Sequence, residues 1–196
     1  MTTTTTHSAI TAAEHTAVMQ AFMQYPLHVV HYLTAPKGQA PTEREVLEAA
    51  LQVRAFDDGV RDVLQRALDM LPEITAAKEN ASDDVLAVLA QLDKDLQNKS
   101  LEDVIKVVQA TRARVPQLAD NLAFVEEMYK DGADTIYSPV YPPAEFLYPP
   151  HFAFDATSFL LGVGLADGLG GAIAGSGGAL VASTSGAITA IVLEAV

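Results

Sequence analysis

Apolar residues recur every three or four positions through most of the first 131 residues, which is the spacing of amphipathic helices. Several of these stripes begin next to a recognisable capping signal. Two starts have capping-box spacing and two have a serine followed by acidic residues: Thr11 with Glu14, Thr42 with Glu45, Ser82, and Ser100. The connections between the stripes are short. The pattern therefore predicts a mainly α-helical fold, with an antiparallel bundle over residues 9–131.

The stripes also predict which side chains face the core and where each helix ends. After Ser82, the inward positions are expected to be Val85, Leu86, Leu89, Leu92 and Leu96. Prolines are expected to end one helix before Pro26, to end at Pro72 a helix that Asp57 or Asp58 caps, and to interrupt the pattern at Pro116. Gly132 is expected at the C′ position of the last helix.

Residues 132–155 have a different character from the bundle. Tyr-Pro-Pro occurs twice, beginning at Tyr141 and Tyr148, and the prolines exclude a regular helix. We expect an extended strap that packs its aromatic rings against the bundle or the tail. An alternative is a docking peptide for an aromatic-lined groove of a partner protein, with Tyr141, Phe146 and Tyr148 as its contact residues.

Residues 156–196 form a Gly/Ala-rich tail with no charged residue between Asp167 and Glu194. That uncharged length could cross a bilayer, so a helical hairpin or span is one expectation. A small residue stands at every fourth position, which allows close backbone packing between helices. This predicted packing register consists of Gly162, Ala166, Gly170, Ala174, Gly178, Ala182, Gly186 and Ala190. Composition contributes much of it, because 21 of the 29 residues from Gly162 to Ala190 are Gly, Ala, Ser or Thr.

Other structures of the tail compete with the helix. The β-branched residues around Ile188 favour strands, so a β-hairpin over residues 178–196 is an alternative. In composition the tail resembles the Gly/Ala-rich, membrane-active segments of some bacteriocins, such as the larger microcins, which implies membrane insertion. The tail departs from that group because it carries no basic residue.

Charge limits the partners of the chain. The net charge is −13, and all 12 Lys and Arg residues lie at or before Lys130. This balance disfavours nucleic acid, whose phosphates are bound through Lys and Arg. The absence of Cys excludes thiolate chemistry. Residues 1–8 are Thr-rich, with no signal-peptide pattern, so we expect a flexible terminus and a cytoplasmic or membrane-associated protein.

No motif in the sequence identifies a reaction or a cofactor. His28 and His31 share a helical face, but no further ligands accompany them, so they are weak metal candidates. The preferred prediction is a non-enzymatic protein whose tail mediates membrane insertion or self-assembly. One alternative is a soluble structural subunit of a homo-oligomer with the tail in its interface. Another is a ligand-binding protein or enzyme with a site near His28, His31, Tyr148 and His151.

Overall fold

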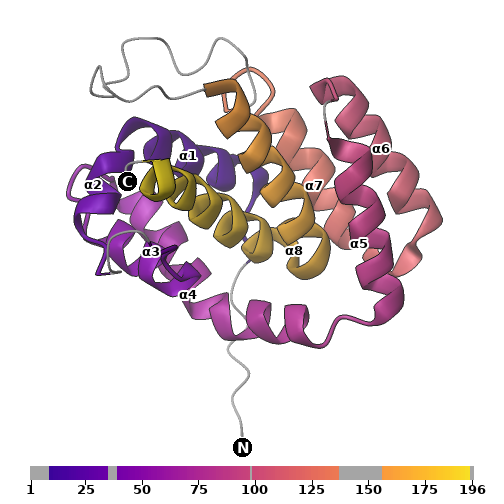
Figure 1. The fold of residues 1–196 in the computed structure, drawn as a ribbon, viewed down its shortest axis with the longest axis horizontal. Helices are drawn as coiled ribbons and strands as arrows, with labels where there is room; N and C mark the ends of the chain where they lie inside the picture. Colours follow the sequence, from indigo (N-terminus) through magenta and orange to yellow (C-terminus); the bar gives the residue numbers. More distant parts are fainter. Residues whose placement is uncertain (1–8, 35–38, 98, 137–155, 195–196) are drawn as a thin grey trace, which may run out of the picture.

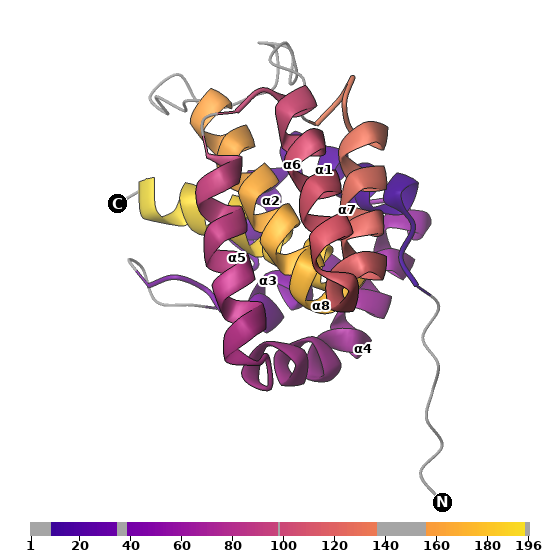
Figure 2. The ribbon, with the colours of Figure 1, turned by 90° about the vertical axis from the view of Figure 1, so that its right-hand side faces the viewer.

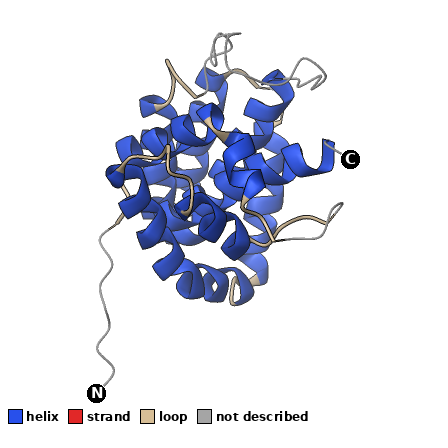
Figure 3. Ribbon diagram, turned by 90° about the vertical axis from the view of Figure 1, so that its left-hand side faces the viewer, coloured by secondary structure: helices blue, strands red, loops and turns tan. Residues whose placement is uncertain are grey.

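The computed structural model describes residues 9–34, 39–97, 99–136 and 156–194, and within these ranges it is a bundle of α-helices (Figure 1). No strand occurs in the described part, where blue helices make up almost all of the ribbon (Figure 3). The mainly α-helical bundle is therefore confirmed. The alternative of a β-hairpin in the tail finds no support, because residues 156–194 are helical.

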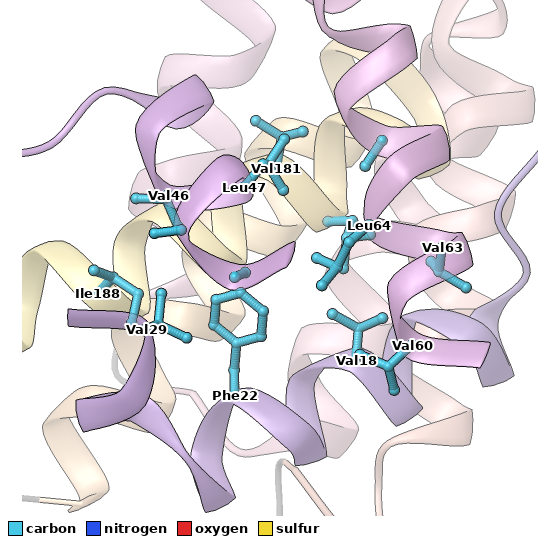
Figure 4. Close-up of a cluster of buried hydrophobic side chains, with 14 of the residues drawn as sticks. Val18, Phe22, Val29, Val46, Leu47, Val60, Val63, Leu64, Val181 and Ile188 are labelled. Atoms are coloured by element: carbon cyan, nitrogen blue, oxygen red, sulfur yellow. The ribbon is translucent and has the colours of Figure 1, made fainter. Parts of the chain in front are cut away.

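Helices α1 to α4 form one half of the bundle. Their bounds are α1 Ala12–Gln24, α2 Pro26–His31, α3 Glu43–Leu51 and α4 Asp58–Glu79. Both predicted capping boxes are present, at Thr11 with Glu14 and at Thr42 with Glu45, and Asp57 caps α4. Their side chains converge on a common centre, which also receives Val181 and Ile188 from the end of the chain (Figure 4).

The predicted end of α4 at Pro72 is wrong, because the helix continues through this proline to Glu79. Proline cannot donate the backbone hydrogen bond to the carbonyl four residues earlier, so continuing the helix has a cost. Burial compensates that cost: Leu71 and Ile74 on either side of Pro72 are 6% and 2% exposed and belong to the core. Tertiary packing has overridden the local signal.

Helices α5 to α7 form the other half. They are α5 Asp83–Leu96, α6 Leu101–Arg114 and α7 Ala119–Asp131, with a 3₁₀ turn at Pro116–Leu118 between the last two. Ser82 and Ser100 cap α5 and α6 as predicted. Leu86 does not face the core: its exposed fraction is 47%, whereas Leu89 is buried. The α5 helix packs along a narrower face than its apolar stripe suggested.

Gly132 does not occupy the predicted C′ position. It is the C-cap residue of α7 and has a right-handed conformation with φ of −81°. Its backbone N–H still bonds to the carbonyl of Met128, at 3.0 Å, so the helix end is satisfied without a left-handed residue.

The last element, α8 (Ala156–Glu194), is two helices joined at Ala174 and Gly175, whose backbone angles are not helical. We call residues 156–173 the first arm, residues 176–194 the second arm, and the whole the hairpin. The arms diverge from this turn, the first running beside α7 and the second passing among α1 to α4 (Figure 1). A view from the side shows the first arm between α5 and α7 (Figure 2). The described side chains of the tail, from Gly168 onward, are thus all buried or half-buried within the bundle.

Candidate functional site

The hairpin connects the two hydrophobic clusters that the described residues form. In the second arm, Leu180, Val181, Ile188 and Ile191 are at most 1% exposed and pack in the cluster of α1 to α4. In the first arm, Ala172 is fully buried in the cluster of α5 to α7, with Leu169 and Ile173 beside it. The first arm therefore packs mainly with α5 to α7 and the second mainly with α1 to α4, although Ala179 of the second arm also lies in the cluster of α5 to α7.

The turn of the hairpin depends on Gly175, whose φ of 62° lies in the left-handed region that other residues avoid. Asn121 of α7 supports the turn, because its side-chain amide donates a hydrogen bond of 3.0 Å to the carbonyl of Ala172. This carbonyl lies at the end of the first arm, where no further helical turn can satisfy it. The asparagine therefore acts as a side-chain cap from a neighbouring helix.

The two arms approach each other closely next to the turn. A Cβ atom placed on Gly170 would lie 2.4 Å from the carbonyl oxygen of Gly178 and 2.6 Å from Cβ of Ala182. A Cβ atom on Gly178 would lie 2.3 Å from the carbonyl oxygen of Gly170 and 2.7 Å from Cβ of Ala174. Backbone atoms cannot yield as flexible side chains do, so only glycine fits at these two positions.

This contact joins four residues of the predicted packing register: Gly170, Ala174, Gly178 and Ala182. Gly186 is half-buried further along the second arm. Gly162, Ala166 and Ala190 lie outside the residues whose side chains the structure describes. Within the described part, the register is used for contacts inside the chain.

A buried polar contact connects the second arm to α1. His15 and Ser183 are both 0% exposed, and His15 Nε2 lies 3.2 Å from Ser183 Oγ. The Ser183 hydroxyl also lies 2.8 Å from the carbonyl of Ala179, so it connects the imidazole of His15 to the backbone of the second arm. The sequence analysis missed this pair. The one available signal was a histidine on the same helical face as the core residues Val18 and Phe22.

The histidines proposed as weak metal ligands lie at the surface beside tyrosine rings. His28 and His31 are exposed, and their rings lie against Tyr25 and Tyr32, at centroid distances of 5.5 and 5.2 Å. The described residues contain no group of three or more side chains that could hold a metal ion. Tyr141, Phe146, Tyr148 and His151 lie outside the described residues, so the docking peptide and the site near the strap stay predictions.

One surface depression of about 420 Å³ lies between α6 and α7 and is lined by Gln109, Arg112, Ala113, Ala119 and Glu126. Its polar groups bind one another. Glu126 accepts hydrogen bonds from Lys130, from Gln109 at 2.7 Å, and from Arg112 at 3.3 Å. The bonds from Lys130 and Gln109 hold the pKa of Glu126 below its ordinary value. The depression therefore presents a satisfied ion-pair cluster.

Among the described residues, no helix combines the length and hydropathy that a membrane crossing requires. The distinctive feature of the described residues is a pair of helices rich in small residues, packed against the longer side chains of the other helices. Comparison with protein-family models, curated proteins and solved structures finds no match to this chain, so the functional argument rests on the hairpin itself.

Proposed function

We propose that this chain is a non-enzymatic self-assembly protein, in which helices α1 to α7 shield the hairpin until it is transferred to a second copy of the chain. The observation that carries the proposal is the contact at Gly170 and Gly178, where two backbones meet without intervening side chains. Surfaces of this kind associate with like surfaces, because close approach maximises van der Waals contact along the helices.

The composition of the hairpin supports its transfer to a second copy over a purely structural role in its own bundle. Seven glycines lie from Gly168 to Gly186 inclusive, six of them outside the turn at Gly175, and glycine inside a helix costs about 1 kcal/mol relative to alanine. Larger apolar side chains would build a more stable central helix, because each would bury more apolar surface. The arms therefore depend on tight packing against a partner surface. Their own bundle provides such a surface, and the hairpin of a second copy offers another.

A second copy fits the hairpin better than lipid does. The chain has no basic residue after Lys130, so the tail lacks the cationic anchors that hold peptides at an anionic membrane surface. The polar residues Ser183 and Thr184 are fully buried and bond to carbonyls of their own helix. Packing against another small-residue helix keeps such groups covered without requiring a long apolar span.

Deleting the tail would not test the proposal, because the hairpin belongs to both hydrophobic clusters. A reversible lock is more informative. A Cβ atom on Gly171 would lie 4.0 Å from Cβ of Val125, within the range that disulfides require. The double variant Val125→Cys/Gly171→Cys should therefore tie the first arm to α7, and the natural chain contributes no other thiol.

Oxidised and reduced forms of this one variant provide matched samples for light scattering across a protein concentration series. We expect the unmodified chain and the reduced form to assemble and the oxidised form to remain monomeric. Equal assembly of both forms would show that the hairpin need not leave the bundle. A reduced form that stays monomeric, but floats with phosphatidylcholine vesicles when the oxidised form does not, would replace the second copy by lipid.

A further inference from the structure

The turn of the hairpin is covered by the segment that precedes α1. The backbone N–H of Ile10 donates to Ser176 Oγ at 3.1 Å, and Ser176 is the first residue after Gly175. The Ile10 side chain is 1% exposed and belongs to the cluster of α1 to α4. The two residues are separated by 166 positions in sequence, so the beginning of the described chain holds the tail at its tightest point.

One arginine fastens this segment to α4. Arg66 pairs with the carboxylate of Glu14, donates to the carbonyl of Ala9 at 3.4 Å, and pairs with Asp62 at 3.1 Å. Its side chain is only 17% exposed. Glu14 in turn accepts from the backbone N–H of Thr11 at 2.8 Å in the capping box. The Arg66 guanidinium therefore binds the first residue of this segment, Ala9, and its last residue, Glu14.

We infer that residues 9–14 form a latch over the hairpin turn, that the bonds of Arg66 hold this latch closed, and that opening of the latch controls release of the hairpin. The inference rests on the proposed function, since it names the step that regulates transfer. Apart from the buried side chains of Ile10 and Ala12, the latch is held by one backbone hydrogen bond to Ser176 and by the bonds of Arg66. Segments held by few contacts open before a packed core does.

Alternative roles for these contacts are weaker. The Arg66 pairs could merely stabilise α4, as Arg61 does one turn earlier by pairing with Asp58 at 2.9 Å and donating to the carbonyl of Val53 at 3.3 Å. Arg61, however, touches neither residues 9–14 nor the hairpin in any of these bonds. The two arginines therefore make a matched pair: similar bonds on the same helix, with only one of them on the latch.

Release can be measured by thiol labelling of the folded, full-length chain, which has no cysteine of its own. Val181→Cys places a probe in the second arm and Val108→Cys places one in α6, and both valines are 0% exposed. We expect Arg66→Met to accelerate labelling of the Val181→Cys probe at least tenfold and to leave the Val108→Cys probe within threefold. Arg61→Met should leave both probes within threefold.

A second variant keeps the test valid if Arg66→Met folds poorly. Ser176→Ala removes the acceptor at the turn and should accelerate the second-arm probe in the same way. Because both changes open one latch, the double variant should label no more than about threefold faster than the faster single variant, whereas independent effects would multiply.

The outcomes separate the latch from the proposed function. Equal acceleration of both probes by Arg66→Met, or acceleration as large by Arg61→Met, would overturn the latch. Faster labelling of the second-arm probe alone, in a protein that stays monomeric in light scattering, would support the latch and contradict self-assembly. Assembly of the unmodified chain, with no change of labelling in either latch variant, would support self-assembly and contradict the latch.

Discussion

Helices α1 to α4 and helices α5 to α7 each pack against one arm of the hairpin, and they do so with different side chains. The first group brings aromatic rings into the core, with Phe22 and Phe56 at a centroid distance of 5.6 Å. The second group contributes one buried ring, Tyr129, and otherwise mainly aliphatic side chains, many of which remain half-buried, such as Val85, Val104 and Ile105. The half around the second arm is therefore more deeply packed than the half around the first arm.

This difference has a consequence for the hairpin. On the hairpin side, separating the first arm from α5 to α7 exposes Ala172 and the half-buried Leu169 and Ile173, whereas withdrawing the second arm exposes four fully buried aliphatic side chains: Leu180, Val181, Ile188 and Ile191. The hydrophobic free energy scales with the apolar area exposed, so the second step costs more. We expect the first arm to open more readily. The latch at residues 9–14 lies at the turn, which joins the first arm to the second.

The largest expected effect comes from truncating one core residue in each half. Phe22 and Leu92 are each 1% exposed, in α1 and α5 respectively. We expect Phe22→Ala to lower the free energy of unfolding by about 4 kcal/mol and Leu92→Ala by about 2.5 kcal/mol. The half-buried neighbours of Leu92 can collapse into the space, whereas those of Phe22 cannot. Urea unfolding measures both values, and equal or reversed losses would contradict the difference in packing.

An effect between those of Phe22→Ala and Leu92→Ala is expected where the two halves meet through the hairpin. Gly178→Ala puts a Cβ atom against the carbonyl of Gly170, so the arms must separate, at a cost of about 3 kcal/mol. Gly59→Ala is the control, since Gly59 lies in the first turn of α4 and the nearest atom to its added Cβ is a side-chain oxygen of Asp57 at 3.2 Å. The control should change the free energy of unfolding by less than about 1 kcal/mol. Two equal losses would show that the arms do not touch as described.

The smallest expected effect concerns two carboxylates that form ion pairs, one in each half of the bundle, and it depends on pH. Burial alone would raise the pKa of Glu14, but hydrogen bonds from Thr11 and Arg66 outweigh it, so its pKa lies below 4.5. The pKa of Glu126 is lowered mainly by Lys130 and Gln109. A lowered folded-state pKa contributes stability above the unfolded pKa, and that contribution is lost as pH falls through the folded pKa.

Both carboxylates should therefore support the fold at neutral pH and lose their contribution in acid, below pH 4.5. Glu14→Gln and Glu126→Gln should each cost about 1 kcal/mol at pH 7 and nothing further in acid. Unfolding measured at pH 7 and pH 3 checks this. In the labelling experiment, only Glu14→Gln should accelerate the probe in the second arm, because Glu126 lies between α6 and α7. A variant that costs more at pH 3 than at pH 7 would reverse the sign and refute the assignment.

Local signals in the sequence predicted the helix starts well. Thr11, Thr42, Ser82 and Ser100 each cap the helix expected of them, since a hydroxyl beside free backbone amides acts over three residues. Predictions that depended on neighbours far along the chain were less reliable. Pro72 lies inside a helix, and Leu86 faces solvent, because packing against other helices decides both outcomes.

For the candidate site, the sequence showed a register of small residues but could not say what they touch. Any partner with a smooth surface can pack against a stripe of small residues such as Gly170, Ala174, Gly178 and Ala182. The contact between His15 and Ser183 was equally hidden, since 168 positions separate the two residues. The bond between Ile10 and Ser176 was hidden for the same reason.

By itself, the sequence determined that the chain is helical, where its capped helices begin, and that its tail is uncharged and rich in small residues. These properties depend on interactions within a few residues, which composition and spacing record directly. Only the tertiary structure decided that the tail folds back at Gly175, that it packs into both hydrophobic clusters, and that Arg66 fastens the beginning of the described chain over the turn. Those contacts join distant segments, and their energies exist only once the segments are brought together.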